Sequence, residues 1–251
     1  MRRWGARLLA GWLGAGLLAL AVLAAGCAAP PVTPSPVRLE ATDLAESMLA
    51  DLVQADSGIK TEMAALPLPA LSDDLAAGRA DLALAVNYAP GQFATPLGYV
   101  TFVVVVNSAN PVSRLTAAQL RDIYAGRATD WQQVGGAQAA IEVVSRESGS
   151  DAASAFSTAA LLGASPTLNA LVAPDWAAMR QAVSQNPAAI GYLPAPEGLA
   201  SVKAVGLDVT LRALVVAVAP REPAGAARSF LAWAQSEAGQ AVIARHYEAV
   251  R

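Results

Sequence analysis

Sulfur and imidazole groups are almost absent from this sequence. Its 251 residues include one cysteine, Cys27, and one histidine, His246. One cysteine cannot close an internal disulfide, and one histidine cannot build a histidine metal cluster. No pair of carboxylates stands out, and "SGSDA" (148–152) lacks the flanking glycines of a hydrolase nucleophile elbow. We therefore expect no catalytic residue, no metal and no cofactor, and a hydrolase is the poorest of the alternatives.

Positive charge is also scarce. The chain has 17 lysines and arginines against 20 aspartates and glutamates, a net charge of −3. Three of the arginines lie within the first seven residues, and without them 14 basic residues face 20 acidic ones, a net charge of −6. An acidic body of this kind argues against nucleic acid or a broad anionic membrane surface as a partner. A small anion stays compatible with it, because local groups recognise such a ligand.

The first 27 residues have the layout of an export signal. Three arginines precede an uncharged run from Leu8 to Ala25, which ends in small residues before Cys27. A permanent membrane span is the alternative, since about 17–25 apolar residues suffice to cross a bilayer. The small-residue exit and the prolines after it favour a cleaved signal over residues 1–26. The segment resembles a bacterial lipoprotein signal, which implies a lipid on Cys27, although Ala24 stands where that signal prefers a larger apolar residue.

A spacer follows the signal. The stretch "AAPPVTPSP", residues 28–36, has four prolines in nine positions. Such a sequence is extended and packs poorly. We expect residues 27–36 to tether a globular body, which begins at Val37, to a lipid anchor in the membrane.

Short apolar runs alternate with helical patterns from Val37 onward. The expected strands are "VRLEA", "IKTEMAA", "DLALAV", "LGYVTFVVVVN", "AIEVVS", "AIGYLP" and "LRALVVAVAP". The expected helices are Leu44–Gln54, a short helix that Ser72 caps and Gly78 ends, one that Thr116 caps and Gly126 closes, one that begins within residues 145–156, and Pro174–Ser184, Ala224–Ser236 and Glu237–Tyr247. This alternation predicts α/β layers with a mainly parallel sheet.

Several segments, in the right order, resemble phosphate-type (PstS-like) periplasmic substrate-binding proteins of ABC importers. They are "GRADLALA" (78–85), "LTAAQLRDIYAGRATDWQQVGG" (115–136), "SRESGSDAASAF" (145–156), "NPAAIGYLP" (186–194) and "SFLAWAQSEAGQAVI" (229–243). The resemblance implies a two-lobed α/β binding protein of the type II-like fold. Such a protein closes on a small oxyanion, with phosphate as the first candidate, and delivers it to an ABC permease.

The two longest expected strands flank the middle third of the body and are candidates to cross between two lobes. Lobe 1 would then comprise residues 37–106 plus 209–251, and lobe 2 residues 107–208. A single α/β domain fits the same periodicity.

Anion capture is expected in the stretch "SRESGSDAASAF". A helix N-terminus offers free N–H groups and the positive end of the helix dipole, and Ser148, Gly149 and Ser150 add hydroxyls and close backbone approach. Arg146 can hold a phosphate-like group through two N–H donors. An ordinary helix start, with Ser150 as N-cap and Asp151 as an acidic first-turn residue, explains the same sequence.

This stretch departs from the family that it resembles. Asp151, Ala152 and Ala153 stand where the family has a glycine, a threonine and often an arginine. A carboxylate accepts a hydrogen bond from a protonated anion and repels a fully ionised one, so Asp151 would select the protonated form. The alternatives are that Asp151 caps its own helix in a decayed pocket, or that it receives a cationic or neutral ligand.

The first lobe offers fewer ligand groups. Thr42 is the hydroxyl that survives in "ATD" (41–43), where the family has a Gly-Ser-Thr turn, and Asn87 follows the buried strand "DLALAV". Helix capping by Thr42 or Asp43, and a simple turn at Asn87, are the alternatives. The expected ligand set is Thr42, Asn87, Arg146, Ser148, Gly149, Ser150 and Asp151. If this pocket is degenerate, the alternative function is a sensory or interaction lipoprotein on the same scaffold.

Overall fold

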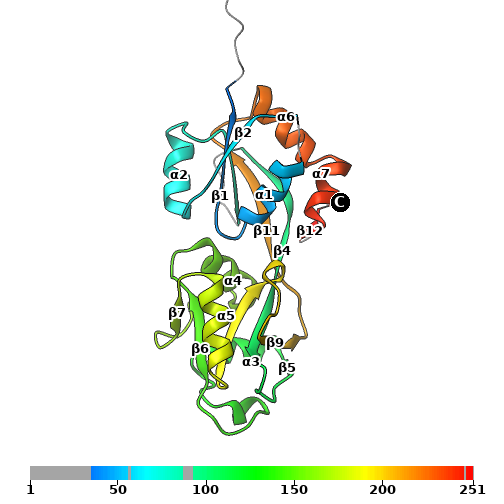
Figure 1. The fold of residues 1–251 in the computed structure, drawn as a ribbon. Coiled ribbons are helices and arrows are strands. Elements are labelled where there is room, and N and C mark those ends of the chain that lie inside the picture. The colour runs from blue at the N-terminus through cyan, green and yellow to red at the C-terminus, as the bar shows by residue number, and fades with distance from the viewer. Residues whose placement is uncertain (1–34, 56–57, 87–92, 246, 251) are drawn as a thin grey trace, which may run out of the picture. The chain divides into compact units, whose positions relative to one another are not determined.

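Most strands of the protein join one sheet, in the order β2-β1-β3-β11-β4-β8-β6-β7 (Figure 1). The structure is a computed structural model that describes residues 35–55, 58–86, 93–245 and 247–250. The expected signal and most of the tether lie outside these residues, and so do Cys27, Asn87 and His246.

Parallel pairs form the two ends of the sheet. At one end β1 lies between two parallel neighbours, and the three strands are β2 (Thr61–Ala65), β1 (Val37–Ala41) and β3 (Leu82–Val86). At the other end β6 has two parallel neighbours, and the strands are β8 (Ala189–Pro194), β6 (Glu142–Arg146) and β7 (Leu171–Ala173). The carboxyl ends of β1 and β6 are therefore the places where loops can present ligand groups, as in other parallel sheets.

One long strand connects the two ends. β4 (Phe93–Asn107) pairs with β11 (Leu211–Ala219) up to Phe102 and with β8 from Phe102 onward, and both pairings are antiparallel. Two short strands, β9 (Val202–Ala204) and β12 (Glu248–Ala249), also pair with β4. The valine-rich second half of β4 suits a strand with neighbours on both edges. The strand begins at Phe93, four residues before the expected start at Leu97.

Seven α-helices accompany the sheet within the described residues. They are α1 (Glu46–Ala55), α2 (Leu68–Ala76), α3 (Ala117–Tyr124), α4 (Asp151–Leu161), α5 (Trp176–Gln185), α6 (Gly225–Ala234) and α7 (Glu237–Ile243). Short 3₁₀ turns lie at Trp131–Val134 and Ala195–Glu197, and a separate parallel pair joins β5 (Arg114–Leu115) to β10 (Gly206–Leu207). The predicted α/β class, with parallel strands and flanking helices, is confirmed. No helix in this part of the chain is long and apolar enough to span a membrane.

The observed helix starts confirm one predicted N-cap and contradict another. Thr116 forms the predicted N-cap of α3, because its hydroxyl accepts a hydrogen bond from the Gln119 N–H at 3.1 Å. The predicted cap at Ser72 is wrong, since α2 already begins at Leu68, after Pro67, and Ser72 lies inside it. Proline has a fixed φ that suits the first turn of a helix, so "LPLP" starts this helix earlier than a hydroxyl cap would.

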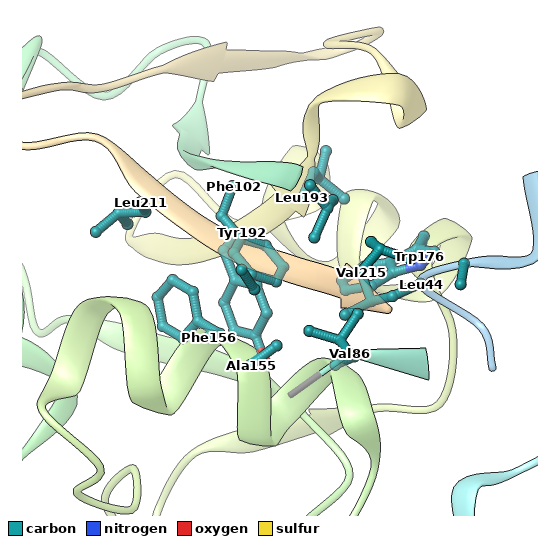
Figure 2. Packing of buried hydrophobic residues seen from close by; sticks show 14 of the residues in the cluster. Leu44, Val86, Phe102, Ala155, Phe156, Trp176, Tyr192, Leu193, Leu211 and Val215 are labelled. Carbon is teal, nitrogen blue, oxygen red and sulfur yellow. The ribbon is translucent and has the colours of Figure 1, made fainter. Parts of the chain in front are cut away.

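A stack of aromatic rings forms the centre of the core between β4, β8 and α4. The rings of Phe156 and Tyr192 lie parallel with their centroids 3.6 Å apart, and Phe102 meets both edge-on at 5.8 Å (Figure 2). Tyr124 from α3 packs against Phe156 at 5.1 Å. Rigid stacking of this kind fixes the start of α4 and the end of β6, from which the candidate site is built.

Candidate functional site

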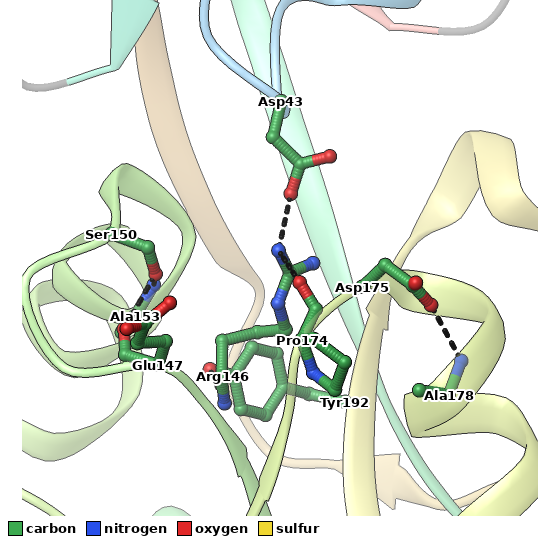
Figure 3. Close-up of polar contacts among 9 residues, drawn as sticks. All are labelled: Asp43, Arg146, Glu147, Ser150, Ala153, Pro174, Asp175, Ala178 and Tyr192. Atoms are coloured by element: carbon green, nitrogen blue, oxygen red, sulfur yellow. Dashed lines mark hydrogen bonds and ion pairs between the residues drawn. The ribbon is translucent and has the colours of Figure 1, made fainter. Parts of the chain in front are cut away.

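Arg146 is the last residue of β6, and its guanidinium is held from three sides. Its side chain is only 6% exposed. Nη2 forms an ion pair with Asp43 Oδ2 at 2.7 Å and donates a hydrogen bond to the Pro174 carbonyl oxygen at 2.9 Å (Figure 3). The guanidinium carbon lies 4.3 Å from the centre of the Trp176 ring, which is a favourable cation–π distance. The arginine is thus fixed in place before any ligand arrives.

Several buried polar atoms around Arg146 have no hydrogen-bond partner among the described residues. They are Nε and Nη1 of Arg146, Oγ1 of Thr42 and Oδ2 of Asp151. Buried polar groups are nearly always paired, because leaving one unpaired costs about 1–3 kcal/mol. Donors and acceptors left open together in one place are typical of a site that a polar ligand completes.

Thr42 and Asp43 reach this place from the loop after β1. The Thr42 backbone bonds to Leu84 through its N–H and to Ala45 through its carbonyl, while its side chain is 1% exposed. Helix α1 begins only at Glu46, so the Thr42 hydroxyl stays inside the protein with no hydrogen bond of ordinary geometry. Sequence reasoning named Thr42 but took Asp43 only as a helix cap, and the structure places Asp43 on Arg146.

Asp151 is the first residue of α4, and it is buried, with 4% of its surface exposed. Burial raises the pKa of its carboxyl, and the nearby Asp43 charge adds to the rise. The Thr42 hydroxyl, the Ala152 N–H and the Arg146 charge work in the opposite direction and lower this pKa. These mutual effects place Thr42, Asp43, Arg146 and Asp151 at one site, contributed by the loops after β1 and β6.

The turn between β6 and α4 contains one residue with positive φ and a serine that is already hydrogen-bonded. Gly149 has φ +90°, a backbone conformation that L residues rarely adopt. The Ser150 hydroxyl accepts from the Ala153 N–H at 3.1 Å and donates to the Glu147 carbonyl oxygen at 2.7 Å. Ser150 therefore caps α4 as the ordinary interpretation expected, and Ser148 is exposed.

Tyr192 links the candidate site to the aromatic core. Its hydroxyl oxygen accepts a hydrogen bond from the Arg146 backbone N–H at 3.1 Å, and its ring stacks on Phe156. Burial raises the pKa of this tyrosine, so it stays neutral and keeps its hydrogen. Two landmarks of the family resemblance, the phenylalanine after the hydroxyl-rich turn and the glycine-tyrosine strand, thus meet in space.

The structure brings together three of the expected ligand residues and adds one. Thr42, Arg146 and Asp151 converge with Asp43, and Ser150 lies one residue away at the cap of α4. Ser148 and Gly149 form the turn beside them, and Asn87 lies outside the described residues. No group of three or more potential metal ligands occurs in the described part of the chain.

A family model agrees with this architecture. Residues 69–219, more than half of the chain, match the model described as the PBP superfamily domain. The chain belongs to the PBP superfamily. The matched region includes β6, α4 and α5 of the candidate site.

Among solved structures, phosphate-type members of this superfamily are similar along nearly their whole length. A Clostridium perfringens protein described as a phosphate ABC transporter substrate-binding protein, solved with bound phosphate, is 25% identical with a TM-score of 0.76. A Vibrio cholerae ABC-type phosphate transport receptor is 24% identical with a TM-score of 0.73. Each similarity covers 86% of this chain and 100% of the other. The predicted resemblance and the two-lobed fold are confirmed.

A similar fold also occurs in a protein of another name, OxyR. A reduced form of OxyR from N. meningitidis is 17% identical with a TM-score of 0.59, and the similarity covers 84% of this chain and 95% of that one. Identity this low shows the fold alone. Function in this PBP-superfamily chain has to be argued from the groups of its own site.

Proposed function

We propose that this protein is an extracytoplasmic solute-binding protein that captures a small oxyanion, phosphate above all, for an ABC importer. The observation that carries the proposal is the set of buried polar atoms at the site without a hydrogen bond of ordinary geometry: two guanidinium nitrogens of Arg146, the hydroxyl of Thr42 and one carboxyl oxygen of Asp151, of which the hydroxyl and the carboxyl act on each other. A tetrahedral oxyanion offers several acceptors in a small volume and, when it is protonated, a donor as well. The acceptors and the donor of such an ion therefore correspond to the donors and acceptors at the site.

Each open atom has a role toward such a ligand. Arg146 donates from Nε or from Nη1, which lie on different edges of the guanidinium, and a charge-assisted hydrogen bond of this kind is the strongest available to a phosphate-like group. The Thr42 hydroxyl donates or accepts as required. The Asp151 carboxylate accepts a hydrogen bond from the protonated oxygen of the ligand.

The charges of the site favour an ion of low charge. Arg146 is the only cation among the groups that act on Asp151, whereas Asp43 and Asp151 both carry carboxyls. Sulfate is fully ionised and has no hydrogen to donate, so it meets a carboxylate without compensation. Phosphate keeps at least one hydrogen near neutral pH, which supports phosphate over sulfate as the ligand.

We also propose how the chain is processed, how it is anchored and how it moves on binding. Residues 1–26 are removed as a lipoprotein signal, Cys27 carries the lipid, and residues 27–36 tether the body to the membrane. Two lobes, which β4 and β11 connect, close on the ligand by a hinge motion, which for such proteins takes microseconds to milliseconds. Closure would be measured as a ligand-dependent decrease in the radius of gyration by small-angle scattering.

Thermal melts of the soluble body from Val37 onward test the ligand class. A ligand at 100 times its Kd adds about 2.7 kcal/mol of stability, which for a chain of this size raises the melting midpoint by roughly 5–10 °C. We expect millimolar phosphate to give such a rise and sulfate a smaller one. If phosphate, sulfate and molybdate all leave the melting midpoint unchanged at pH 5.5 and 7.5, the proposed oxyanion binding is wrong.

A further inference from the structure

The ion pair between Asp43 and Arg146 joins two distant parts of the sheet. Asp43 follows β1 and Arg146 ends β6, and four strands, β3, β11, β4 and β8, lie between these two in the sheet order. The Asp43 side chain is 38% exposed, whereas that of Arg146 is 6% exposed. The aspartate is therefore free to leave the pair toward solvent, while the arginine stays in place.

The pair also occupies the nitrogen that an anion needs most. Both two-donor edges of a guanidinium include Nη2, paired with either Nε or Nη1. Nη2 forms the 2.7 Å ion pair with Asp43 Oδ2 and donates a hydrogen bond to the Pro174 carbonyl oxygen. An oxyanion that binds Arg146 through two parallel hydrogen bonds has to displace one of these two partners from Nη2. Asp43 is the partner that can move, since Pro174 belongs to the segment that leads into α5.

We propose that Asp43 is a competing carboxylate, which occupies Arg146 until an incoming oxyanion displaces it. This proposal rests on the oxyanion-binding function and adds a competitor that belongs to the chain itself. Asp43 lowers the affinity for every anion, because it holds the donor and adds a negative charge at the site. It also keeps the loops after β1 and β6 together until the ligand replaces it.

Calorimetric titration with inorganic phosphate at pH 7.5 and low salt tests the displacement. Asp43→Asn keeps the shape of the side chain but removes its charge, and Glu147→Gln is the matched control, because Glu147 is an exposed carboxylate in the neighbouring turn. We expect Asp43→Asn to bind phosphate on the order of tenfold more tightly than the unmodified body, given the strength of a charge interaction at this distance. The control should change affinity less than twofold. Equal or weaker binding by Asp43→Asn overturns the proposal.

A second measurement needs no ligand. Melting midpoints are compared for the unmodified body, Asp43→Asn, Arg146→Met and the double variant, all without added anion. We expect Asp43→Asn to lower the midpoint by a few degrees when Arg146 is present and to have no effect when it is absent, because the two residues are coupled. An equal effect in both backgrounds overturns the proposed pair.

The two failures can be told apart. If phosphate binds and Asp43→Asn does not raise the affinity, the displacement proposal is wrong and the proposed oxyanion binding is retained. If neither the unmodified body nor Asp43→Asn binds phosphate, sulfate or molybdate at millimolar concentration, both proposals are wrong.

Discussion

The hydroxyl oxygen of Tyr192 accepts the backbone N–H of Arg146 at 3.1 Å, and this bond links the aromatic core to the candidate site. The Tyr192 ring lies 3.6 Å from that of Phe156 on α4, whose first residue is Asp151. A single side chain in the core thus positions both the cation and the carboxyl of the site. We therefore expect the stacked rings of Phe156 and Tyr192 to limit the motion of the site.

Tyr192→Phe tests this link. The variant keeps the stacked ring but leaves the buried Arg146 N–H without its acceptor, which costs about 1–3 kcal/mol. We expect the melting midpoint of the body to fall by several degrees, at roughly 2–4 °C per kcal/mol. Tyr99→Phe, at a half-buried tyrosine of β4, is the control and should shift the midpoint by less than a degree or two. Equal shifts in both variants would count against the link.

Arg146→Ala and Asp151→Gly separate the two charged groups of the site. Arg146→Ala should abolish the phosphate-dependent rise in melting midpoint, since it removes the fixed cation of the site.

Asp151→Gly should narrow the difference between the midpoint rises with phosphate and with sulfate, because it removes the carboxylate that repels ions without a hydrogen. Melts with each anion at pH 5.5 and 7.5 provide the measurement. An unchanged phosphate-to-sulfate preference in Asp151→Gly would show that Asp151 does not discriminate.

Glu40 predicts a pH dependence of stability. This residue of β1 is buried beneath α2, and burial together with the neighbouring Asp74 carboxylate raises the pKa of Glu40 from 4.5 to about 7. A raised carboxyl pKa stabilises the fold fully below pH 4.5, and this stabilisation is lost as the pH rises through 7. The loss is about 3 kcal/mol at most.

Urea unfolding between pH 4.5 and 8 measures this effect. We expect Glu40→Gln to remove most of the decline in the free energy of unfolding over that range. Glu62→Gln, at an exposed position of β2, should leave the decline as it is. A decline that persists in Glu40→Gln would assign it to another group.

Gly191→Ala tests why the glycine-tyrosine strand has a glycine. A Cβ at Gly191 would lie 2.7 Å from Met179 Sδ and 2.8 Å from Val183 Cγ2, both on α5. Such overpacking typically costs about 1–3 kcal/mol, so the melting midpoint should fall by several degrees. At Gly206 an added Cβ meets nothing closer than 3.6 Å, and Gly206→Ala should be nearly neutral. A neutral Gly191→Ala would show that α5 can shift away from β8.

Cys27→Ser tests the expected lipid anchor in cells. Two or three acyl chains at about 0.8 kcal/mol per buried CH₂ hold a protein firmly on a membrane. We expect the full-length chain to lose acylation and to leave the membrane fraction when Cys27 is replaced. Mass spectrometry of the purified N-terminus gives the second check, and an unmodified N-terminus beyond Cys27 in the unaltered protein would exclude the lipoprotein proposal.

The sequence by itself determined the alternation of strands and helices, the class of fold and the resemblance to phosphate-type binding proteins. These follow from local signals, such as the β-branched run of β4 and the hydroxyl cap at Thr116, which act over a few residues. It also named Thr42, Arg146 and Asp151 as ligand candidates, because their segments resemble the ligand-binding turns of those proteins. The local signal failed at Ser72, where a proline pair began the helix earlier.

Only the tertiary structure decided how these groups meet. The pairing of Asp43, which follows β1, with Arg146, which ends β6, relates two residues far apart in the chain and in the sheet order, and no local pattern predicts it. Burial turned Asp151 from an ordinary first-turn acid into a group with a raised pKa, because the loop after β1 approaches the start of α4. Local propensity depends on neighbours in the chain, whereas desolvation and charge pairing depend on neighbours in space.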